Sequence, residues 1–311
     1  MHTLRISLDW TPNTNHAGLY LALERGYFRD LDLDVRVWTP DQDNYQSTPA
    51  RRLAAGLTDI AFAPSESVFS LRTARRPADV EAVASLLNRD ASGIAVLESS
   101  GIRRPRDLDG RVYASYSARY EDAIVAAMIE SDGGRGDFTS LNPERLGIWD
   151  TLLDGSADAT WIFLAWEGVL AARDGIALRT FQMEDYGIPY GYSPVLITHS
   201  GRRDEATMRF LAGLKQGFEE AVIERNEAVE ALISQNRSHF TDDARELLRQ
   251  SLDVLAPYLV DAQGTWGVMR GDRWEEFSRW LNDRGLLARP MGAAELANVD
   301  VLPDAAARFS V

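Results

Sequence analysis

The sequence predicts an α/β fold made of two similarly built domains, with a helical extension at the end of the chain. Three observations carry this prediction. β-rich segments alternate with helical ones over about the first two thirds of the 311 residues, which is typical of mainly parallel sheets flanked by helices. The last third has helical periodicity with few strand signals, and residues 53–61 resemble residues 153–160.

The predicted strands are short apolar or β-branched segments bounded by turn residues. We expect strands at residues 4–8, 35–38, 60–63, 80–85, 94–97, 112–115, 160–163 and 195–198. The predicted helices carry an apolar stripe along one face. We expect helices at residues 15–25, 48–55, 120–131, 204–225, 227–235, 242–254 and 270–283. Gly26 provides a C-terminal cap for the first helix, and Thr48-Pro49 open the second.

The internal repeat indicates how the domains are organised. Each copy joins a helix end to a turn with Gly and Asp and then to an apolar strand. Chance recurrence is the alternative, because Gly and Asp are common in turns. Irregular segments at 87–93 and 187–192 are the candidate crossovers. We expect one domain at 1–88 plus 194–311, a second at 92–188, and hinges near 88–93 and 187–194.

The composition excludes several partners and chemistries. The 33 Lys and Arg residues against 47 Asp and Glu give a formal net charge of −14, which repels nucleic acid and anionic membrane surfaces. No cysteine is present, so a disulfide, a cysteine-ligated metal and a thiol nucleophile are excluded. The four histidines are far apart in the sequence, and no metal site is expected. Walker, dinucleotide-binding and nucleophile-elbow motifs are also missing, and we expect no cofactor.

The amino terminus runs directly into a strand-like segment, without the basic and apolar regions of a signal peptide. No window of the sequence is long and apolar enough for a membrane span, so no membrane insertion is expected. As the sequence stands, we expect a cytoplasmic protein. If an export signal has been removed, we expect a periplasmic or otherwise extracytoplasmic one.

The densest polar and aromatic cluster spans residues 9–16, after the first strand and at the start of the first helix. It places Asp9, Trp10, Asn13 and His16 at the carboxyl edge of a sheet, where ligands bind in open α/β folds. The alternative is a capped turn with Trp10 packed in the core. An Asn-rich stretch beside Trp and His exceeds what a cap needs, and this favours a binding site.

A second cluster, Ser65, Glu66 and Ser67, lies between the strand at 60–63 and the helical segment after it. Its position matches that of the first cluster, at the carboxyl end of a strand. The alternative is that Ser65 is a plain helix cap. We include all three residues in the candidate ligand-binding set.

Three further clusters contribute Tyr116, Trp161 with Glu167, and Tyr190, the last at a predicted crossover. The alternative for Trp161 and its neighbour Trp166 is a place in the core. The five clusters share flat aromatic rings, amides, hydroxyls and carboxylates, and they contain few arginines. Aromatic rings sandwich a flat ligand and carboxylates accept from an exocyclic amine. This set favours a neutral or amino-bearing heterocycle over sulfate or phosphate.

The segment Leu8-Asp9-Trp10-Thr11-Pro12-Asn13-Thr14-Asn15-His16-Ala17-Gly18 resembles the opening of the thiamine-pyrimidine group of periplasmic-binding-protein-like proteins. That group includes formylaminopyrimidine-binding proteins of ABC transporters and the fungal pyrimidine synthases of thiamine biosynthesis. The resemblance continues through residues 22–28, 59–61, 84–87 and 185–189, and it covers about two thirds of the chain.

The resemblance implies a two-lobed, periplasmic-binding-protein-like fold of type II that closes on its ligand through a hinge. Trp10 and Asn13 would line the cleft from one lobe, and Tyr116, Trp161 and Glu167 from the other. The implied function is binding of a small aminopyrimidine-like thiamine precursor without covalent chemistry. The implied partners are that heterocyclic ligand and, in the transporter branch, an ABC transporter permease.

The synthase branch of the group implies pyridoxal phosphate held by a lysine, a histidine slightly later, and a cysteine-rich run near an iron site. Here the lysine position falls at about Ala63 and the histidine position at about Ser67. These departures favour a binding protein over an enzyme. The alternatives are a cytosolic enzyme of thiamine-pyrimidine biosynthesis, with His16, Glu66 and Glu167 as acid–base candidates, and a binding protein for sulfonate, nitrate or another small solute.

Overall fold

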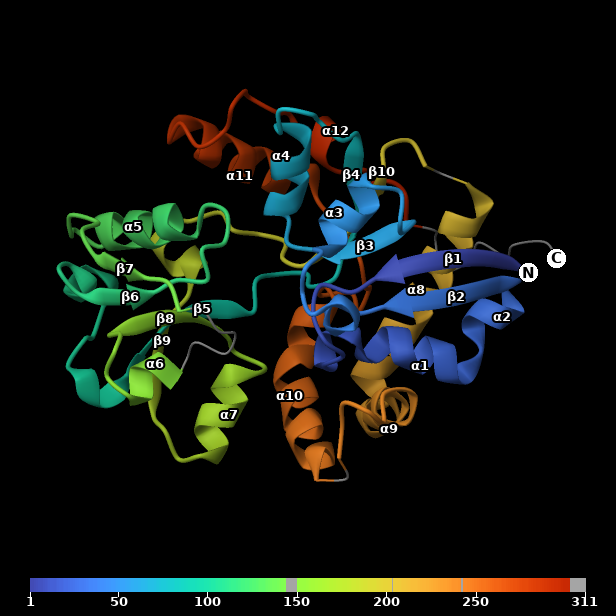
Figure 1. Ribbon diagram of the computed structural model, residues 1–311, viewed down its shortest axis with the longest axis horizontal. Helices are drawn as coiled ribbons and strands as arrows, with labels where there is room; N and C mark the ends of the chain where they lie inside the picture. The colour runs from blue at the N-terminus through green and yellow to red at the C-terminus, as the bar shows by residue number, and fades with distance from the viewer. Residues whose placement is uncertain (144–149, 203, 242, 303–311) are drawn as a thin grey trace. The chain divides into compact units, whose positions relative to one another are not determined.

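The chain divides into two compact units in the computed structural model, which describes residues 1–143, 150–202, 204–241 and 243–302. Unit 1 comprises Met1–Asp90 and Gly191–Val311, and unit 2 comprises Ala91–Tyr190 (Figure 1). Each unit has its own five-stranded sheet with flanking helices. The α/β fold class predicted from the sequence is confirmed.

The sheet of unit 1 has the strand order β2-β1-β3-β10-β4. Its strands are β1 (His2–Ser7), β2 (Leu33–Trp38), β3 (Ile60–Ala63), β4 (Val80–Ser85) and β10 (Val195–His199). β1 pairs in parallel with β2 and β3, whereas β10 runs antiparallel between β3 and β4. Every residue of β3 and β4 is buried, as expected for strands covered on both faces.

The connections of the first half of unit 1 are short helices, with 3₁₀ helices labelled η. They are η1 (Thr14–His16), α1 (Ala17–Arg25), α2 (Tyr27–Asp30), η2 (Pro40–Asp43), α3 (Pro49–Ala54) and α4 (Glu66–Arg72). α1 ends at Gly26, whose φ of 77° is left-handed and whose N–H donates to the carbonyls of Ala22 and Leu23. Thr48 Oγ1 accepts from the Arg51 N–H at 3.3 Å and caps α3. Both predicted helix ends are thereby confirmed.

The C-terminal helices all belong to unit 1, which confirms the helical extension. They are α8 (Glu205–Ile223), α9 (Arg225–Gln235), α10 (Ala244–Leu259), α11 (Gly271–Asp283) and α12 (Ala293–Leu296). α8 packs on α1 and α2, and α9 packs on α1 and α10. The α1–α8 contact depends on glycine, because a Cβ on Gly217 would lie 2.2 Å from the Gly18 carbonyl oxygen. None of the described helices is both long and apolar enough to cross a membrane.

Unit 2 repeats the topology of unit 1 with the strand order β7-β6-β8-β5-β9. Its strands are β5 (Ser92–Leu97), β6 (Val112–Ala114), β7 (Thr139–Leu141), β8 (Ala159–Phe163) and β9 (Leu178–Phe181). Its helices are η3 (Glu98–Ser100), η4 (Pro105–Leu108), α5 (Glu121–Ser131), α6 (Asp150–Leu153), α7 (Glu167–Arg173) and η5 (Met183–Tyr186). β6 pairs in parallel with β7 and β8, and β5 runs antiparallel between β8 and β9.

Three sequence predictions need correction. The strands β7 and β9 were not predicted, because both are short and most of their residues are half-buried or exposed. The helix predicted at 242–254 continues to Leu259 and has Pro257 inside its last turn. Its predicted first residue, Asp242, lies outside the described residues.

The internal repeat corresponds to two turns, one before β3 and one before β8. These strands stand third in the strand orders of their sheets. Gly56 and Gly155 have φ values of 69° and 75°, and an aspartate follows each of them. Asp59 Oδ2 accepts from the Arg5 N–H at 2.8 Å, and Asp158 Oδ2 accepts from the Val112 N–H at 2.9 Å. The same side chain therefore ties β3 to β1 in unit 1 and β8 to β6 in unit 2.

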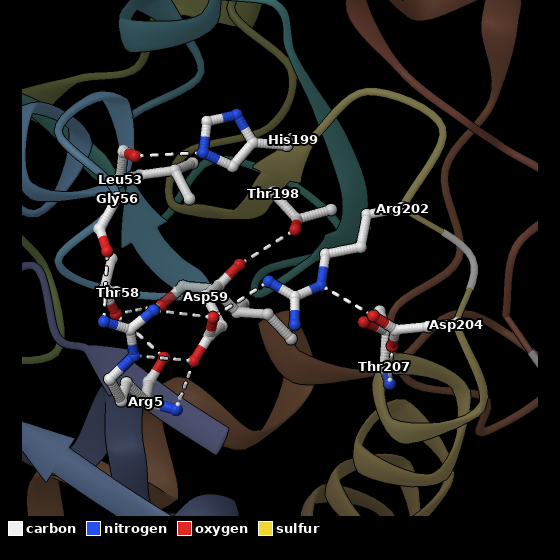
Figure 2. A network of polar contacts seen from close by, with 11 residues as sticks. Arg5, Leu53, Gly56, Thr58, Asp59, Thr198, His199, Arg202, Asp204 and Thr207 are labelled. Atoms are coloured by element: carbon white, nitrogen blue, oxygen red, sulfur yellow. Dashed lines mark hydrogen bonds and ion pairs between the residues drawn. The ribbon is translucent and has the colours of Figure 1, made fainter. Parts of the chain in front are cut away.

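Asp59 also forms the centre of an ion-pair network at the amino end of β3. Figure 2 shows its carboxylate between the guanidinium groups of Arg5 and Arg202, each with a nitrogen 2.9 Å from Oδ1. Arg202 continues to Asp204, which caps α8 by accepting from the Thr207 N–H at 2.8 Å. Burial alone would raise the pKa of Asp59, but the two arginines hold that pKa well below its usual range. The network joins β1, β3 and the start of α8.

Candidate functional site

The first candidate cluster lies at the carboxyl edge of the unit 1 sheet, directly after β1. The Trp10 side chain is 38% exposed, and its ring centroid lies 5.4 Å from that of Tyr45. Tyr45, from the loop after η2, is 42% exposed. The alternative of a Trp10 packed in the core is therefore wrong. Two open aromatic rings at the carboxyl edge of a sheet suit the stacking of a flat ligand.

His16 is fully buried, and both of its ring nitrogens bond within this cluster. The Asn13 N–H lies 3.2 Å from Nδ1, which must accept that hydrogen. Nε2 then carries the ring hydrogen and donates to Asp9 Oδ1 at 2.8 Å. His16 consequently positions Asp9 and does not face a ligand.

Two other polar side chains of this loop have different roles: Asn13 caps a helix, and Asp9 is a partly exposed hydrogen-bond acceptor. Asn13 caps η1, because its side-chain oxygen accepts from the Asn15 N–H at 2.8 Å. The Asp9 side chain is 16% exposed, and among the described residues no Lys or Arg pairs with it. The carboxylate oxygens of Asp9 can accept hydrogen bonds from an amine of a ligand.

The second cluster lies one strand further along the same sheet, at the end of β3. Ser65 and Glu66 are both buried, and the Ser65 hydroxyl donates to Glu66 Oε2 at 3.3 Å. Ser65 stands at the N-cap of α4 without making a side-chain cap hydrogen bond, so the plain-cap alternative is wrong. Ser67 is half-buried, and its N–H donates to the Pro64 carbonyl at 2.9 Å. These residues provide a second acidic group at the carboxyl edge.

In unit 2, Tyr116 follows β6 and is 36% exposed. The loop that carries it is held by Glu121, the first residue of α5. The Glu121 carboxylate accepts from the Tyr113 hydroxyl at 2.7 Å, the Tyr116 N–H at 3.1 Å and the Ala118 N–H at 2.9 Å. Burial raises the pKa of Glu121 although these three donors oppose the shift. Glu121 is thus the buried support of the loop that presents Tyr116.

The remaining predicted residues of unit 2 are Trp161 on β8, Glu167 at the start of α7 and Tyr190 after η5. Trp161 is 8% exposed and meets Tyr190 edge-on, with ring centroids 5.5 Å apart. Most of the Trp161 side chain is therefore buried in the core, as the alternative interpretation proposed. Glu167 begins α7 and accepts from the Phe163 N–H at 2.9 Å, and burial raises the pKa of its carboxyl. Glu66 and Glu167 are equivalent, because each begins the helix that follows the third strand of its sheet.

Left-handed backbone conformations gather at these two edges. Asn44, Tyr45, Ser117 and Tyr120 have φ between 53° and 69°, a region that costs energy for residues other than glycine. Asn44 and Tyr45 present the ring beside Trp10, and the other two flank the loop after Tyr116. Strain of this kind is concentrated at functional sites, and its location supports the assignment of both edges as candidate site.

Three residues of the site were missed by the sequence analysis: Tyr45, Glu121 and Arg52. Tyr45 and Glu121 stand in ordinary loop and helix-start contexts, so only their folded partners distinguish them. Arg52, on α3, lies over the ring of Trp38 with its guanidinium carbon 3.9 Å from the ring centroid. Its Nε donates to Ser7 Oγ at 3.2 Å. A Pro49 helix start one turn earlier was the available signal that Arg52 lies near the same edge.

The residues of the site do not suit the cofactor of the synthase branch. Ala63, at the lysine position, is buried, and Ser67 stands at the histidine position. The single lysine of the chain, Lys215, lies in α8 and pairs with Glu219 at 2.5 Å. Among the described residues, no group of three or more His, Asp or Glu side chains could hold a metal ion.

The sequence of this chain is similar to those of known proteins. The sequence model of a family described as NMT1/THI5 like matches residues 13–228. The formylaminopyrimidine-binding protein of Halalkalibacterium halodurans is 25% identical over 299 residues, which are 95% of this chain and 89% of that protein. The 4-amino-5-hydroxymethyl-2-methylpyrimidine phosphate synthase of Candida albicans is 32% identical over 95 residues, which are 30% of this chain and 26% of that enzyme.

Among solved structures, the periplasmic aliphatic sulphonate binding protein SsuA from Escherichia coli superposes with a TM-score of 0.70 and 15% sequence identity. The superposition covers 96% of this chain and 97% of SsuA. At that identity the likeness concerns the fold alone.

Proposed function

This chain belongs to the NMT1/THI5-like family, and from that premise we propose that it is a solute-binding protein for a small aminopyrimidine-like thiamine precursor. The observation that carries the proposal is the open ring pair of Trp10 and Tyr45 beside the Asp9 carboxylate. A relative that aligns over 95% of this chain is named for binding formylaminopyrimidine.

In this proposal, unit 1 supplies recognition in two parts. The Trp10 ring stacks on the face of the pyrimidine, because the site offers an exposed aromatic surface. Asp9 accepts a hydrogen bond from the exocyclic amine, and its orientation is fixed by the buried His16. A half-buried acceptor with a fixed direction selects an amine over a carbonyl group at that position.

Unit 2 contributes, in the same proposal, Tyr116, Trp161, Glu167 and Tyr190. Tyr116 offers an open ring, whereas Trp161 and Tyr190 offer ring edges. Hinge closure on the ligand is expected from the family resemblance. The residues Asn13, Ser65, Glu66 and Ser67 complete the proposed set as neighbours that shape the unit 1 edge.

Reversible binding is favoured over catalysis by the residues themselves. An acid–base role for His16 conflicts with the hydrogen bonds at both of its ring nitrogens. Lys215, in α8, would be the only lysine able to hold pyridoxal phosphate, and it is paired with Glu219. The enzyme alternative stays open at Glu66 and Glu167, and the experiment below distinguishes it.

We further propose that the protein delivers its ligand to an ABC transporter permease, in an extracytoplasmic compartment. Solved structures of the same fold include a periplasmic binding protein and a ligand-binding component of an ABC-type import system. The exposed ring of Trp10 and the carboxylate of Asp9 suit reversible binding of a ligand.

Calorimetry with formylaminopyrimidine and with 4-amino-5-hydroxymethyl-2-methylpyrimidine tests the proposal. We expect a micromolar or tighter complex, about −8 kcal/mol or better, with at least one of them. The W10A variant should bind more weakly by roughly 1–4 kcal/mol, the usual range for an aromatic anchor. The matched control is W280A, at a half-buried tryptophan on α11, which should leave binding unchanged.

Mass spectrometry of the ligand after incubation separates binding from catalysis. A binding protein returns the pyrimidine with unchanged mass, whereas an altered mass that disappears in E167Q or E66Q would establish the enzyme alternative. Absence of heat with every pyrimidine, for protein whose folding is verified by circular dichroism, would reject the ligand class.

A further inference from the structure

Arg52 differs from Arg5, Arg202 and Arg25 in how its guanidinium is used. The guanidinium groups of Arg5 and Arg202 bond to Asp59 (Figure 2), and that of Arg25 pairs with Glu220 at 2.5 Å. Arg52 makes no ion pair with any described residue. Its only side-chain partners there are the ring of Trp38 and the hydroxyl of Ser7.

These two contacts fix the Arg52 side chain while leaving its two terminal nitrogens unused. The guanidinium carbon lies over the indole ring of Trp38, and Nε donates to Ser7 Oγ. Neither Nη atom has a hydrogen-bond partner among the described residues. A guanidinium stacked on an aromatic ring is oriented in advance, so little side-chain entropy is lost when its two remaining N–H edges bind an anion.

The contacts also locate Arg52 at the ligand edge of the sheet. Ser7 and Trp38 are the last residues of β1 and β2, and they are direct neighbours in the parallel register. Trp10 follows Ser7 by three residues, and Tyr45 follows Trp38 by seven. Arg52 therefore lies on the same edge as the Trp10 and Tyr45 rings.

We propose that Arg52 is an anion-binding residue of the unit 1 site, which selects a pyrimidine carrying a carboxylate or phosphate substituent. This inference rests on the proposed function and names the substituent that the ligand carries. The planar fork of the guanidinium matches two oxygens of either anion. Asp9 would meet the amine of the same ligand, so the opposite charges of the edge would set its orientation.

The test compares three pyrimidines that differ at one position: 4-amino-5-hydroxymethyl-2-methylpyrimidine, its phosphate ester, and the analogue with a carboxylate in place of the hydroxymethyl group. We expect the wild type to bind at least one of the anionic compounds about tenfold to a hundredfold more tightly than the alcohol. The carboxylate and the phosphate ester are separate arms, and the tighter one identifies the natural substituent.

Two variants connect that preference to Arg52. R52Q should remove the preference for the anionic compound and leave the affinity for the alcohol within about twofold, because the lost hydrogen bonds are to the anion alone. R52K keeps the charge but not the fork, and should retain part of the preference. R51Q is the matched control: Arg51 is the exposed neighbour on α3, and its loss should leave the preference intact.

Three outcomes would overturn the inference. The first is equal binding of the alcohol and both anionic compounds by the wild type, which leaves the proposed function standing. The second is an equal loss of all affinities in R52Q together with a lowered melting temperature, which would make Arg52 a brace between α3 and β2. The third is an equal effect of R51Q, which would indicate general charge alone. If none of the pyrimidines binds, the proposed function itself fails.

Discussion

The two units have the same strand order but differ in how each secures its third strand. In unit 1, Asp59 at the start of β3 is held by Arg5 and Arg202 at 2.9 Å each. In unit 2, the equivalent Asp158 at the start of β8 has Arg111 at 3.8 Å. The backbone hydrogen bond of the aspartate is common to both units, so the arginine clamp is an addition specific to unit 1.

The units also differ at their carboxyl edges. Unit 1 presents the exposed rings of Trp10 and Tyr45 beside Asp9, and its helix α8 packs on β2 of the sheet. In unit 2, the Glu121 carboxylate is buried and accepts a hydrogen bond from the backbone of the loop that carries Tyr116. The comparison shows that unit 1 exposes two aromatic rings at this edge, whereas unit 2 has a loop that is held by a buried acid.

The largest effect is expected where the extra helices of unit 1 meet the shared fold. G217A would place a Cβ 2.2 Å from the Gly18 carbonyl oxygen, in contact with backbone that cannot give way. We expect a loss of about 3 kcal/mol or more in the free energy of unfolding, measured in urea. The control is G271A, where nothing lies within 4 Å of the added Cβ. Equal stability of the two variants would show that α8 does not pack on α1 in this way.

The next effect separates the two tryptophans. W161A removes a ring that is 8% exposed and should cost about 3 kcal/mol of unfolding free energy. W10A removes a ring that is 38% exposed and should cost about 1 kcal/mol or less, while weakening ligand binding as described above. Urea unfolding and calorimetry on both variants give the two quantities. A W10A variant that is as unstable as W161A would show that both rings serve the core.

A smaller effect is expected from neutralising the repeated aspartates. D59N leaves Arg5 and Arg202 without their carboxylate, and should lower the unfolding free energy by about 2 kcal/mol. D158N should cost less than about 1 kcal/mol, because its ion pair is long and half-exposed. A comparable loss in both variants would remove the distinction between the two units.

The pH dependence of D59N sharpens this prediction. The pKa of Asp59 is lowered in the folded protein, so its contribution is complete above the unfolded value and is lost as the pH falls toward the folded one. The stability difference between wild type and D59N should therefore be full above about pH 5 and shrink below about pH 4. Unfolding curves between these values measure it.

The smallest effect has the opposite sign and belongs to unit 2. Burial raises the pKa of Glu167, so the folded protein disfavours the ionised carboxylate and loses stability as the pH rises through that pKa. E167Q should stabilise the protein at pH 7 by less than about 1 kcal/mol, and the gain should vanish below about pH 4. The control is E227Q, at an exposed position of α9. A gain that persists in acid would point to packing instead of charge.

Much of the fold follows from local patterns in the sequence. The strands at Ile60–Ala63 and Val80–Ser85 are predicted to the residue. Both are fully buried, and all residues of the first and four of the six in the second are apolar. The strand at Thr139–Leu141 is not predictable in this way. It is short and half-exposed, and it exists because β6 offers it a parallel partner.

The candidate site is predictable in its composition but not in the role of each residue. The cluster at 9–16 stands out by its Trp, Asn and His content. The inferred direction of the His16 ring depends on the Asn13 backbone on one side and Asp9 on the other. Tyr45 becomes part of the site only because η2 returns its ring to Trp10.

The sequence alone determined the alternation of strands and helices, the repeated turn before the third strand and the ends of the first helices. These features depend on residues close together in the chain, such as Gly26 in its left-handed turn. The tertiary structure decided which tryptophan stays exposed, which aspartate is held by two arginines and which arginine lacks a carboxylate partner. Each of these depends on burial and on partners tens of residues away, as for Arg52 with Trp38 and Ser7.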